Sequence, residues 1–480
     1  MSKNIKYYIN SFITILFMAA FRFIPPFGSM TELGMAILGI FLGALYGWIT
    51  CDMIWPSVLA LTFLGFTGYM ENVAQVFTAT ISNPTVQLIL WLLVFAALLT
   101  TTGISKQFVN RLVSSKLCKG HPWILSLFIC LSVMICASFG AGFAAILICW
   151  SLVYTISSQV GYTSKDRWPK LMICSIVFFN ALGALMLPFQ AGVAAIFGYL
   201  ANASGGTYAS YDYGQYLCFS IVFVVSTTIL YFFICKLIIR PDVSKLQTGI
   251  DIGEIEPFNA KQKLAIAALL ALILFTIVPS LLPAGPIKAF LLKTGTCAIV
   301  LLLISFVTFL RDKDGKPFFT FKELANGGIM WPMLFMVATA TTVGGALASG
   351  DTGFTGTIMG LFSPVFESSS PYMFSVVIII ATLCLTNVIN NSVASAIMVP
   401  VMFPFAQQFG VNPMMMTALI CFTANCGLLL PCASPAGAML HGNKEWVNTK
   451  EVVLHSLLFI ACLLIVGSVI GIPFGNIIFK

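Results

Sequence analysis

The stretch from Pro371 to Phe409, PYMFSVVIIIATLCLTNVINNSVASAIMVPVMFPFAQQF, decides the fold. It is about twice as long as one membrane crossing, because roughly 20 apolar residues span the hydrocarbon core of a bilayer. Its centre carries Asn387, Asn390, Asn391 and Ser392 in an otherwise apolar run. The stretch therefore forms either two spans or a helical hairpin that enters and leaves on one side.

A second apolar region of the same length, 122–160, follows a basic stretch and is also interrupted near its middle, at Ser138-Phe139-Gly140-Ala141-Gly142. An offset of about 249 residues aligns Pro122 with Pro371 and places the two interruptions opposite each other. Each region precedes another interrupted apolar segment, which contains Pro188 in the first case and Pro431 in the second. Such self-similarity predicts an internal repeat.

The composition is that of a membrane protein. Hydrophobic residues make up 59% of the 480 and charged residues only 8%, against about 25% charged in soluble domains. The amino end, Met1 to Tyr8, runs into the apolar stretch Phe12 to Phe27 without a small-residue cleavage site, so we expect a retained first span. The chain is therefore expected to be a multi-pass protein of the cell membrane.

Basic residues predict the topology. If both long regions are hairpins, eleven spans remain, expected near 12–27, 34–51, 54–70, 84–103, 170–200, 214–238, 264–282, 287–310, 327–348, 413–440 and 452–476. With the amino end inside, all but four of the 24 lysines and arginines then lie on the cytoplasmic side, which fits the positive-inside bias. The formal net charge of +8 is thus a topology signal, and no nucleic-acid partner is expected.

The predicted organisation is an inverted-repeat transporter fold, all-α and polytopic, with about eleven transmembrane helices and two re-entrant hairpins. Its parts are a first span at 1–33, a first repeat at 34–240 with hairpin 122–160 and broken helix 170–200, a cytoplasmic linker at 241–263, and an inverted second repeat at 264–480 with hairpin 371–409 and broken helix 413–440. Interrupted helices at membrane depth are tolerated where they line a wet cavity. The four interruptions therefore mark the expected binding site.

Several motifs resemble the divalent anion/sodium symporters, the carriers of dicarboxylates, citrate and sulfate. They are Arg22 to Pro26, Gly47-Trp48-Ile49-Thr50 with Trp55-Pro56, Thr386 to Pro400 (TNVINNSVASAIMVP) and Leu430 to Ala438 (LPCASPAGA). Their order and spacing match over essentially the whole chain. The resemblance implies a secondary transporter that works as a homodimer in membrane lipid.

The resemblance also implies the site. That family carries Ser-Asn-Thr at each hairpin tip and Thr-Pro in each broken helix, which together hold a substrate carboxylate and sodium ions. In the second half, Asn390-Asn391-Ser392 and Ser434-Pro435 are close variants. The first half departs, since its tip reads Ala141-Gly142-Phe143, and Ala191-Gly192 follows Pro188 and Gln190 where Thr-Pro is expected. Substrate contacts are accordingly expected at Asn390, Asn391, Ser392, Ser434, Pro435, Gly140, Ala141, Gly142, Pro188 and Gln190.

Sodium prefers hard oxygen ligands. The second half offers them at Thr386, Asn391 and the carbonyls near Ala433, whereas the first tip keeps only backbone groups, whose N–H donors suit an anion. Sodium is the one ion expected, and no organic cofactor is expected. The 14 cysteines are scattered through apolar runs, which argues against a metal cluster.

The sequence therefore predicts a secondary transporter of a small anion, a di- or tricarboxylate, coupled to sodium through the second half. The same fold working as a proton-coupled carrier or an anion exchanger stays open, as does sulfate or another inorganic anion as substrate. An intramembrane enzyme would need paired acids, a Ser/His pair or a metal cluster at depth, and the sequence offers none of these.

Overall fold

A computed structural model describes residues 3–247, 257–283, 285–357, 359–360, 370–431 and 433–479. The regular elements in these ranges are helices, and the one β-bridge among them joins Arg311 to Pro317. This confirms the all-α prediction.

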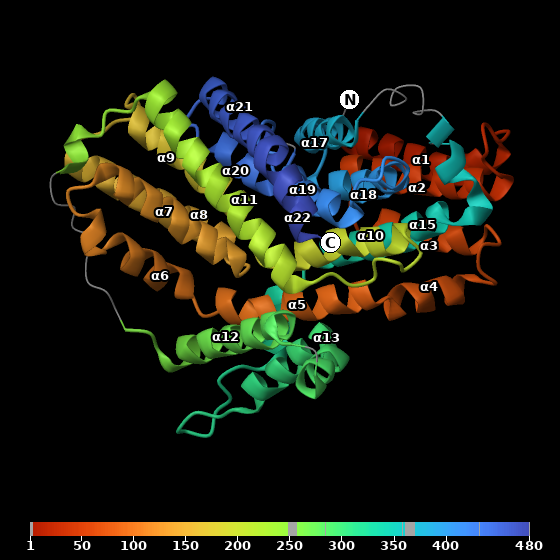
Figure 1. The fold of residues 1–480 in the computed structure, drawn as a ribbon, viewed down its shortest axis with the longest axis horizontal. Coiled ribbons are helices and arrows are strands. Elements are labelled where there is room, and N and C mark those ends of the chain that lie inside the picture. Colours follow the sequence, from red (N-terminus) through yellow and green to blue (C-terminus); the bar gives the residue numbers. More distant parts are fainter. Residues whose placement is uncertain are drawn as a thin grey trace.

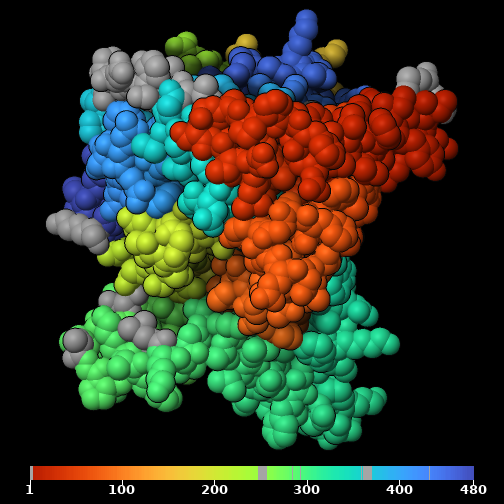
Figure 2. All heavy atoms as spheres, turned by 90° about the vertical axis from the view of Figure 1, so that its right-hand side faces the viewer, coloured from red at the N-terminus to blue at the C-terminus, as the bar shows by residue number. Residues whose placement is uncertain are grey.

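The amino-terminal helices form one end of the molecule, on the right in Figure 1. They are α1 (Lys3–Ala20), α2 (Glu32–Thr50), α3 (Trp55–Gly65) and α4 (Val73–Ser82), and the viewer of Figure 2 faces them, in red and orange. The next helix, α5 (Pro84–Thr100), continues toward the middle of the molecule, and α6 (Ile104–Val113) lies on the left in Figure 1. The α1 helix packs along α2, and α15 (Trp331–Ala348) contacts both α2 and α3, so a late segment of the chain joins the amino-terminal group.

The first long apolar region is a helical hairpin. Its arms contact each other and both pack against the next helix, with α10 and α11 following. The elements are α7 (Pro122–Ser138), α8 (Gly142–Val160), α9 (Arg167–Gly183), α10 (Ala191–Ala203) and α11 (Tyr213–Ile234). The hairpin and α9 lie at the end of the molecule opposite the amino-terminal helices (Figure 1).

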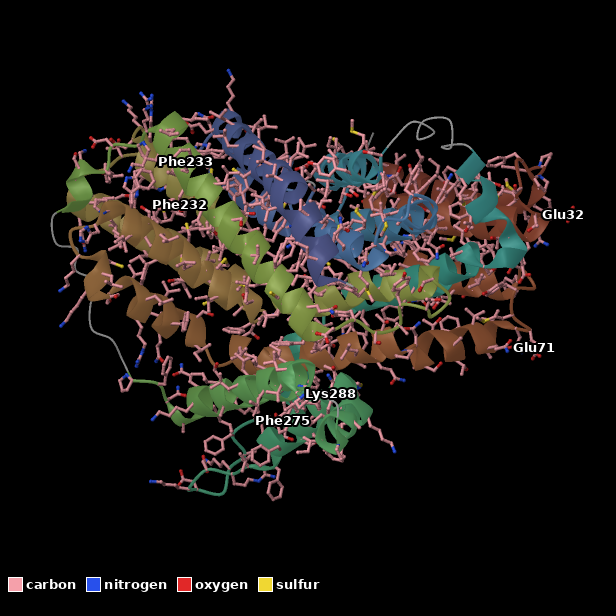
Figure 3. All side chains as sticks on the ribbon, in the orientation of Figure 1. Glu32, Glu71, Phe232, Phe233, Phe275 and Lys288 are labelled. Carbon is pink, nitrogen blue, oxygen red and sulfur yellow. The ribbon has the colours of Figure 1, made fainter. Side chains whose placement is uncertain are left out.

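The second half begins with a helix pair at one edge, in green at the bottom of Figures 1 and 2. These helices, α12 (Ala260–Leu281) and α13 (Pro286–Phe309), pack on each other and on α5. Figure 3 labels Phe275 and Lys288 on this pair, and Phe275 is an exposed apolar side chain. Exposed apolar residues on a helix pair of this kind suit a lipid environment.

The remaining helices build the second hairpin and its surroundings. They are α14 (Phe321–Gly328), α17 (Pro371–Val388), α18 (Asn391–Gln408), α19 (Pro413–Ala424), α20 (Pro435–Gly442), α21 (Thr449–Val466) and α22 (Ile472–Ile478). The hairpin arms α17 and α18 contact each other and α19, and α18 also packs against α10 of the first half. This α10–α18 contact brings the two halves together at the candidate site.

The two hairpins begin alike. Proline occupies the first helical position of α7 and of α17, and a missing N–H is harmless there because the first turn leaves its N–H groups unpaired. The second arms start at Gly142 and Asn391, which keeps the same offset as the two prolines. The correspondence of the hairpins thus extends from their starts to their tips, while the division into inverted repeats stays a prediction.

Among the described residues, seven helices are long and apolar enough to cross a membrane, or eight if the bent pair α4 and α5 counts as one span. This confirms a multi-pass membrane protein, whereas the count of eleven stays a prediction. The seven include the hairpin arms α8 and α17, and they omit α9, α10, α19 and α20, because the interrupted segments consist of shorter helices.

Some sequence-based boundaries were wrong. The α4 helix was not predicted, because its ten residues hold two threonines, a glutamine and a serine and resemble a polar loop. The expected span 287–310 does agree with the bounds of α13, although that helix contains one non-helical residue, Gly295, with φ of 71°. The predicted linker 241–263 extends too far, since α12 already begins at Ala260 behind an Asn259 capping box. Residues 248–256 of that linker lie outside the described residues.

Candidate substrate and ion site

The tip of the second hairpin starts α18. Asn390 is the N-cap residue of this helix, and its side-chain oxygen accepts a hydrogen bond from the Ser392 N–H at 3.0 Å. Ser395, one turn further along, donates its hydroxyl to the Asn391 carbonyl at 3.0 Å. Asparagine is a favoured N-cap because it satisfies an N–H that lacks an intrahelical partner. The Asn390 side chain therefore stabilises the start of α18, and Asn391 and Ser392 are the first residues of the helix.

Thr386 and Asn391 form an oxygen cluster beside α19. The Thr386 hydroxyl lies 2.9 Å from Asn391 Oδ1 and also donates to the Ala424 carbonyl. Thr386 is fully buried. The predicted pairing of Thr386 and Asn391 thus occurs in the structure, with the Ala424 carbonyl as an added oxygen.

Gly427 allows the interrupted helix to approach this cluster. A Cβ at Gly427 would lie 2.2 Å from Asn391 Oδ1 and 2.4 Å from the Thr386 carbonyl oxygen. Only a residue without a side chain fits at that distance. The same Cβ would lie 3.1 Å from the Ala433 methyl, so Ala433, which was predicted as an ion ligand through its carbonyl, is in this neighbourhood.

The loop between α19 and α20 is fixed by side chains. Ser434 is the N-cap of α20: it accepts from the Gly437 N–H at 3.0 Å and donates to the Gly427 carbonyl at 2.6 Å, and Pro435 takes the first helical position. From the hairpin, Asn387 Oδ1 accepts the N–H groups of Leu428 and Leu429 at 3.2 and 2.9 Å. Ser434 and Asn387 thus hold the loop in place beside the oxygen cluster.

Asn425 joins the two halves and was not predicted from the sequence. Its Oδ1 accepts from Asn391 Nδ2 at 3.2 Å, and its Nδ2 donates to the Ala181 carbonyl of α9 at 2.8 Å. The one sequence signal was an asparagine at the end of an apolar run, close to Gly427. Asn425 therefore connects the second hairpin tip to the first broken segment.

The first hairpin tip differs from the second. Gly140 has a left-handed φ of 80°, and its N–H donates to the Ala137 carbonyl, while the Ala141 N–H donates to the Cys136 carbonyl at 2.9 Å. The N–H groups of Gly140 and Ala141 are therefore bonded within the tip, and an anion contact at the tip glycines stays a prediction. At Gly142 a Cβ would lie 1.9 Å from Asn180 Oδ1, so the Asn180 side chain of α9 occupies the space beside this tip.

Backbone carbonyls of the loop between α9 and α10 accept hydrogen bonds from side chains of the protein. Gln190, the N-cap residue of α10, donates its amide to the Ser138 carbonyl at the first tip. Three further side chains donate to loop carbonyls, namely Tyr216 to Leu185 at 2.7 Å, Ser220 to Met186 at 2.7 Å and Tyr211 to Pro188 at 2.5 Å. Oxygens that could face an ion in this half are instead hydrogen-bonded.

A cavity of about 50 Å³ lies between the two halves. Its lining combines the second tip, the start of α10 and part of α15: Leu185, Gly192, Ala195, Ile196, Tyr199, Met333, Val337, Asn391, Ser392, Ser395 and Asn425. Of the residues predicted to bind substrate, Asn391 and Ser392 belong to this lining and the others do not. No charged side chain is among the lining residues, and the volume holds a few waters at most.

Another contact between the halves lies at the starts of α9 and α21. Lys170 Nζ is 2.5 Å from Glu451 Oε1, and both side chains are about one-fifth exposed. Glu451 also closes a capping box with Asn448 at the start of α21. This ion pair joins helices 281 residues apart in sequence.

The metal-site prediction concerns oxygen ligands. The part of the chain that the structure describes contains no group of three His, Cys, Asp or Glu residues that could hold a metal ion. The Thr386–Asn391 cluster has a different composition, since its donors are a hydroxyl, an amide oxygen and backbone carbonyls. Neutral oxygens of this kind suit a hard monovalent cation.

Comparison with known proteins gives the family. The family model described as "Sodium:sulfate symporter transmembrane region" matches residues 7–480. The chain belongs to this family. The match confirms the resemblance drawn from the sequence motifs, and it places the chain among membrane transporters and not among enzymes.

The relatives are distant. An uncharacterized transporter of Methanocaldococcus jannaschii is 24% identical over 280 residues, which are 57% of this chain and 59% of that protein. The sodium-dependent dicarboxylate transporter SdcS of Staphylococcus saprophyticus is 23% identical over 172 residues, 33% of this chain and 32% of that protein. The matched stretches thus span less than two thirds of these relatives.

A solved structure shares the fold. The YdaH transporter of Alcanivorax borkumensis, whose structure is described as having an unusual topology, superposes with a TM-score of 0.58. The match covers 85% of this chain and 90% of that chain at 13% identity. At that identity the likeness supports a transporter fold and says nothing about the substrate.

Proposed function

We propose that the protein is a sodium-coupled secondary transporter of a small anion, a di- or tricarboxylate, in the cell membrane. The observation that carries this proposal is the arrangement at the second hairpin tip. There the start of α18 faces an uncharged cavity, and an oxygen cluster at Thr386, Asn391 and Gly427 lies directly beside it.

The α18 start suits an anion. The first N–H groups of a helix carry partial positive charge, equivalent to roughly half an elementary charge for the whole terminus. Asn391 and Ser392 add an amide and a hydroxyl at the cavity wall, and Ser395 adds a second hydroxyl. With no lysine or arginine in the lining, a helix terminus and neutral donors are the groups that would hold a carboxylate.

A co-bound cation explains how such a site tolerates an anion. Two opposite charges in an uncharged, poorly hydrated cavity attract each other strongly, whereas an isolated charge there is costly. The Thr386 hydroxyl, Asn391 Oδ1 and the carbonyls of Ala424 and Gly427 would hold sodium, with Ala433 nearby. Because Asn391 belongs to both the cluster and the cavity, sodium and anion would stabilise each other, which is the basis of coupling.

The first half would contribute no second ion. Its loop carbonyls accept hydrogen bonds from Tyr211, Tyr216 and Ser220, and the Gln190 amide binds the tip. The second-half carbonyls of Ala424 and Gly427 also accept hydrogen bonds, but the side-chain oxygens of Thr386 and Asn391 accompany them, whereas Ala141 and Gly142 of the first tip carry no side-chain oxygen. This supports coupling through the second half alone.

Transport would need the cavity to widen. The present volume of about 50 Å³ is too small for a dicarboxylate. We propose that the hairpin-containing parts of both repeats move against the amino-terminal helices, as alternating access requires. The inverted repeat, the homodimer and the lipid contacts belong to this proposal as predictions of the family resemblance.

A second candidate is the same carrier without sodium, either proton-coupled or exchanging anions. The first-half loop favours it, because side chains of the protein donate hydrogen bonds to its carbonyls in place of a cation. Sulfate or another inorganic anion remains an alternative substrate.

Thermal unfolding of the purified protein tests the proposal. We would measure it with a panel of di- and tricarboxylates and sulfate, each in sodium and in potassium salt, since a ligand that binds the native state raises the melting temperature. A sodium-dependent shift with a carboxylate supports the proposal. A shift indifferent to sodium supports the exchanger, and no shift with any anion refutes the substrate class.

A variant locates the site. Asn391→Ala removes an oxygen of the cluster and an amide of the cavity, and a hydrogen bond to a charged group is worth about 1.5–3 kcal/mol. We therefore expect at least a roughly tenfold loss of anion affinity. Asn443→Ala is the matched control, because it also removes one side-chain hydrogen bond, to Tyr154, outside the cavity lining. Normal uptake by Asn391→Ala in vesicles would show that the site is misplaced.

A further inference from the structure

Tyr199 of α10 carries a buried hydroxyl without a hydrogen-bond partner among the described residues. The residue is 3% exposed and belongs to the lining of the central cavity. Two other tyrosines of the first half, the half-buried Tyr211 and the buried Tyr216, each donate to a loop carbonyl. The Tyr199 hydroxyl at this cavity, in contrast, forms no hydrogen bond with another described residue.

An unpartnered hydroxyl is costly. A buried polar group that lacks a hydrogen bond forfeits its interaction with water, and native structures contain few such groups. Phenylalanine would fill the same volume without that cost. The hydroxyl thus points to a partner that enters the cavity during the transport cycle.

The position of Tyr199 along α10 supports this. Gly192, Ala195, Ile196 and Tyr199 line the central cavity, while the next turn, at Asn202, lines a second and larger pocket of about 340 Å³.

The α15 helix passes between the same two pockets. Met333 and Val337 line the central cavity, and Thr341, Thr342 and Gly345 line the larger pocket. The α10 and α15 helices contact each other. Tyr199 is thus the last residue of α10 that lines the central cavity, one turn before Asn202 lines the larger pocket.

We propose that Tyr199 is a substrate-binding residue whose hydroxyl donates a hydrogen bond to the transported anion once the cavity widens. The second half would hold one carboxylate at Asn391 and Ser392, and Tyr199 would reach the other acceptor group of the ligand from the first half. The hydroxyl takes over the role of the tip side chains that Ala141 and Gly142 cannot provide. This inference rests on the proposed function and narrows the ligand to an anion with two separate acceptor groups.

The test compares Tyr199→Phe with Tyr216→Phe in the full-length protein, using succinate as the dicarboxylate and butyrate as the acid that lacks the second carboxylate. For Tyr199→Phe we expect a rise of at least about tenfold in the succinate concentration for half-maximal thermal shift, with butyrate binding unchanged. Without ligand, its melting temperature should equal or exceed that of the wild type, because an unpaired polar group is removed.

The control separates binding from folding. Tyr216→Phe leaves the Leu185 carbonyl without its donor, so it should lower the melting temperature without ligand and leave the succinate response intact. Succinate affinity within twofold of wild type in Tyr199→Phe, or an equal loss for butyrate, would overturn the assignment. A wild-type protein that responds to no anion would instead refute the proposed function itself.

Discussion

Replacing Gly427 by alanine perturbs the proposed sodium site directly. The new Cβ would lie 2.2 Å from Asn391 Oδ1 and 2.4 Å from the Thr386 carbonyl oxygen, whereas real Cβ atoms essentially never approach within 3.0 Å of such neighbours. One of these groups must therefore move by several tenths of an ångström. Thr386 O is a backbone atom, so it cannot rotate away, and the Asn391 amide is held by Asn425.

The size of the effect follows from this displacement. Overpacking of a buried site costs about 1–3 kcal/mol, and metal–ligand distances tolerate only about 0.2 Å of change. We therefore expect the Gly427→Ala protein to fold with a lowered melting temperature. The sodium concentration for half-maximal anion uptake should rise at least roughly tenfold, which corresponds to about 1.4 kcal/mol.

The assay is a sodium titration of uptake into vesicles at saturating dicarboxylate, together with thermal unfolding without ligand. Gly344→Ala in α15 is the matched control, since nothing lies within 4 Å of its Cβ position. A Gly427→Ala protein with the sodium response of the wild type would refute the placement of the ion at this cluster. An equal effect of both substitutions would show that glycine flexibility, and not contact with the cluster, is responsible.

Two further predictions concern contacts outside this cluster. Gln190→Ala removes the hydrogen bond to the Ser138 carbonyl. It should lower the free energy of unfolding by about 1 kcal/mol and leave the sodium dependence of uptake unchanged. A changed sodium dependence would mean that the first half does bind an ion. Lys170→Met and Glu451→Gln, alone and combined, should show a coupling of about 1 kcal/mol in a double-mutant cycle of thermal stability, because solvent still reaches both side chains and screens their attraction. Strictly additive effects would exclude a stabilising ion pair.

The sequence determined the class of the protein and the position of its hairpins. Apolar runs and scarce charge require a bilayer, and that physical constraint acts on every span independently of the others. Pro122 and Pro371 start the hairpins where expected, because proline is favoured at a first helical position and unfavourable further inside. Local chemistry of this kind is readable without a structure.

Part of the candidate ion site could be predicted from the sequence. Thr386 and Asn391 lie five residues apart across one helix end, so their contact follows from local geometry. Gln190 and Pro188 were predicted as substrate contacts. In the structure the Gln190 amide donates to the Ser138 carbonyl, and the Pro188 carbonyl accepts from the Tyr211 hydroxyl. Which side of a polar residue faces a cavity depends on neighbours that sequence spacing does not specify.

Contacts between the halves were decided by the tertiary structure alone. Asn425 reaches Ala181 across 244 residues of sequence, and Tyr199 shares a cavity with Asn391 because α10 packs against α18. Polarity and spacing mark a residue as unusual, but whether its partner is another helix, a loop carbonyl or a transported anion is settled by three-dimensional packing. For this protein the sequence determined the hairpins and the second tip, and the packing of the halves determined what surrounds them.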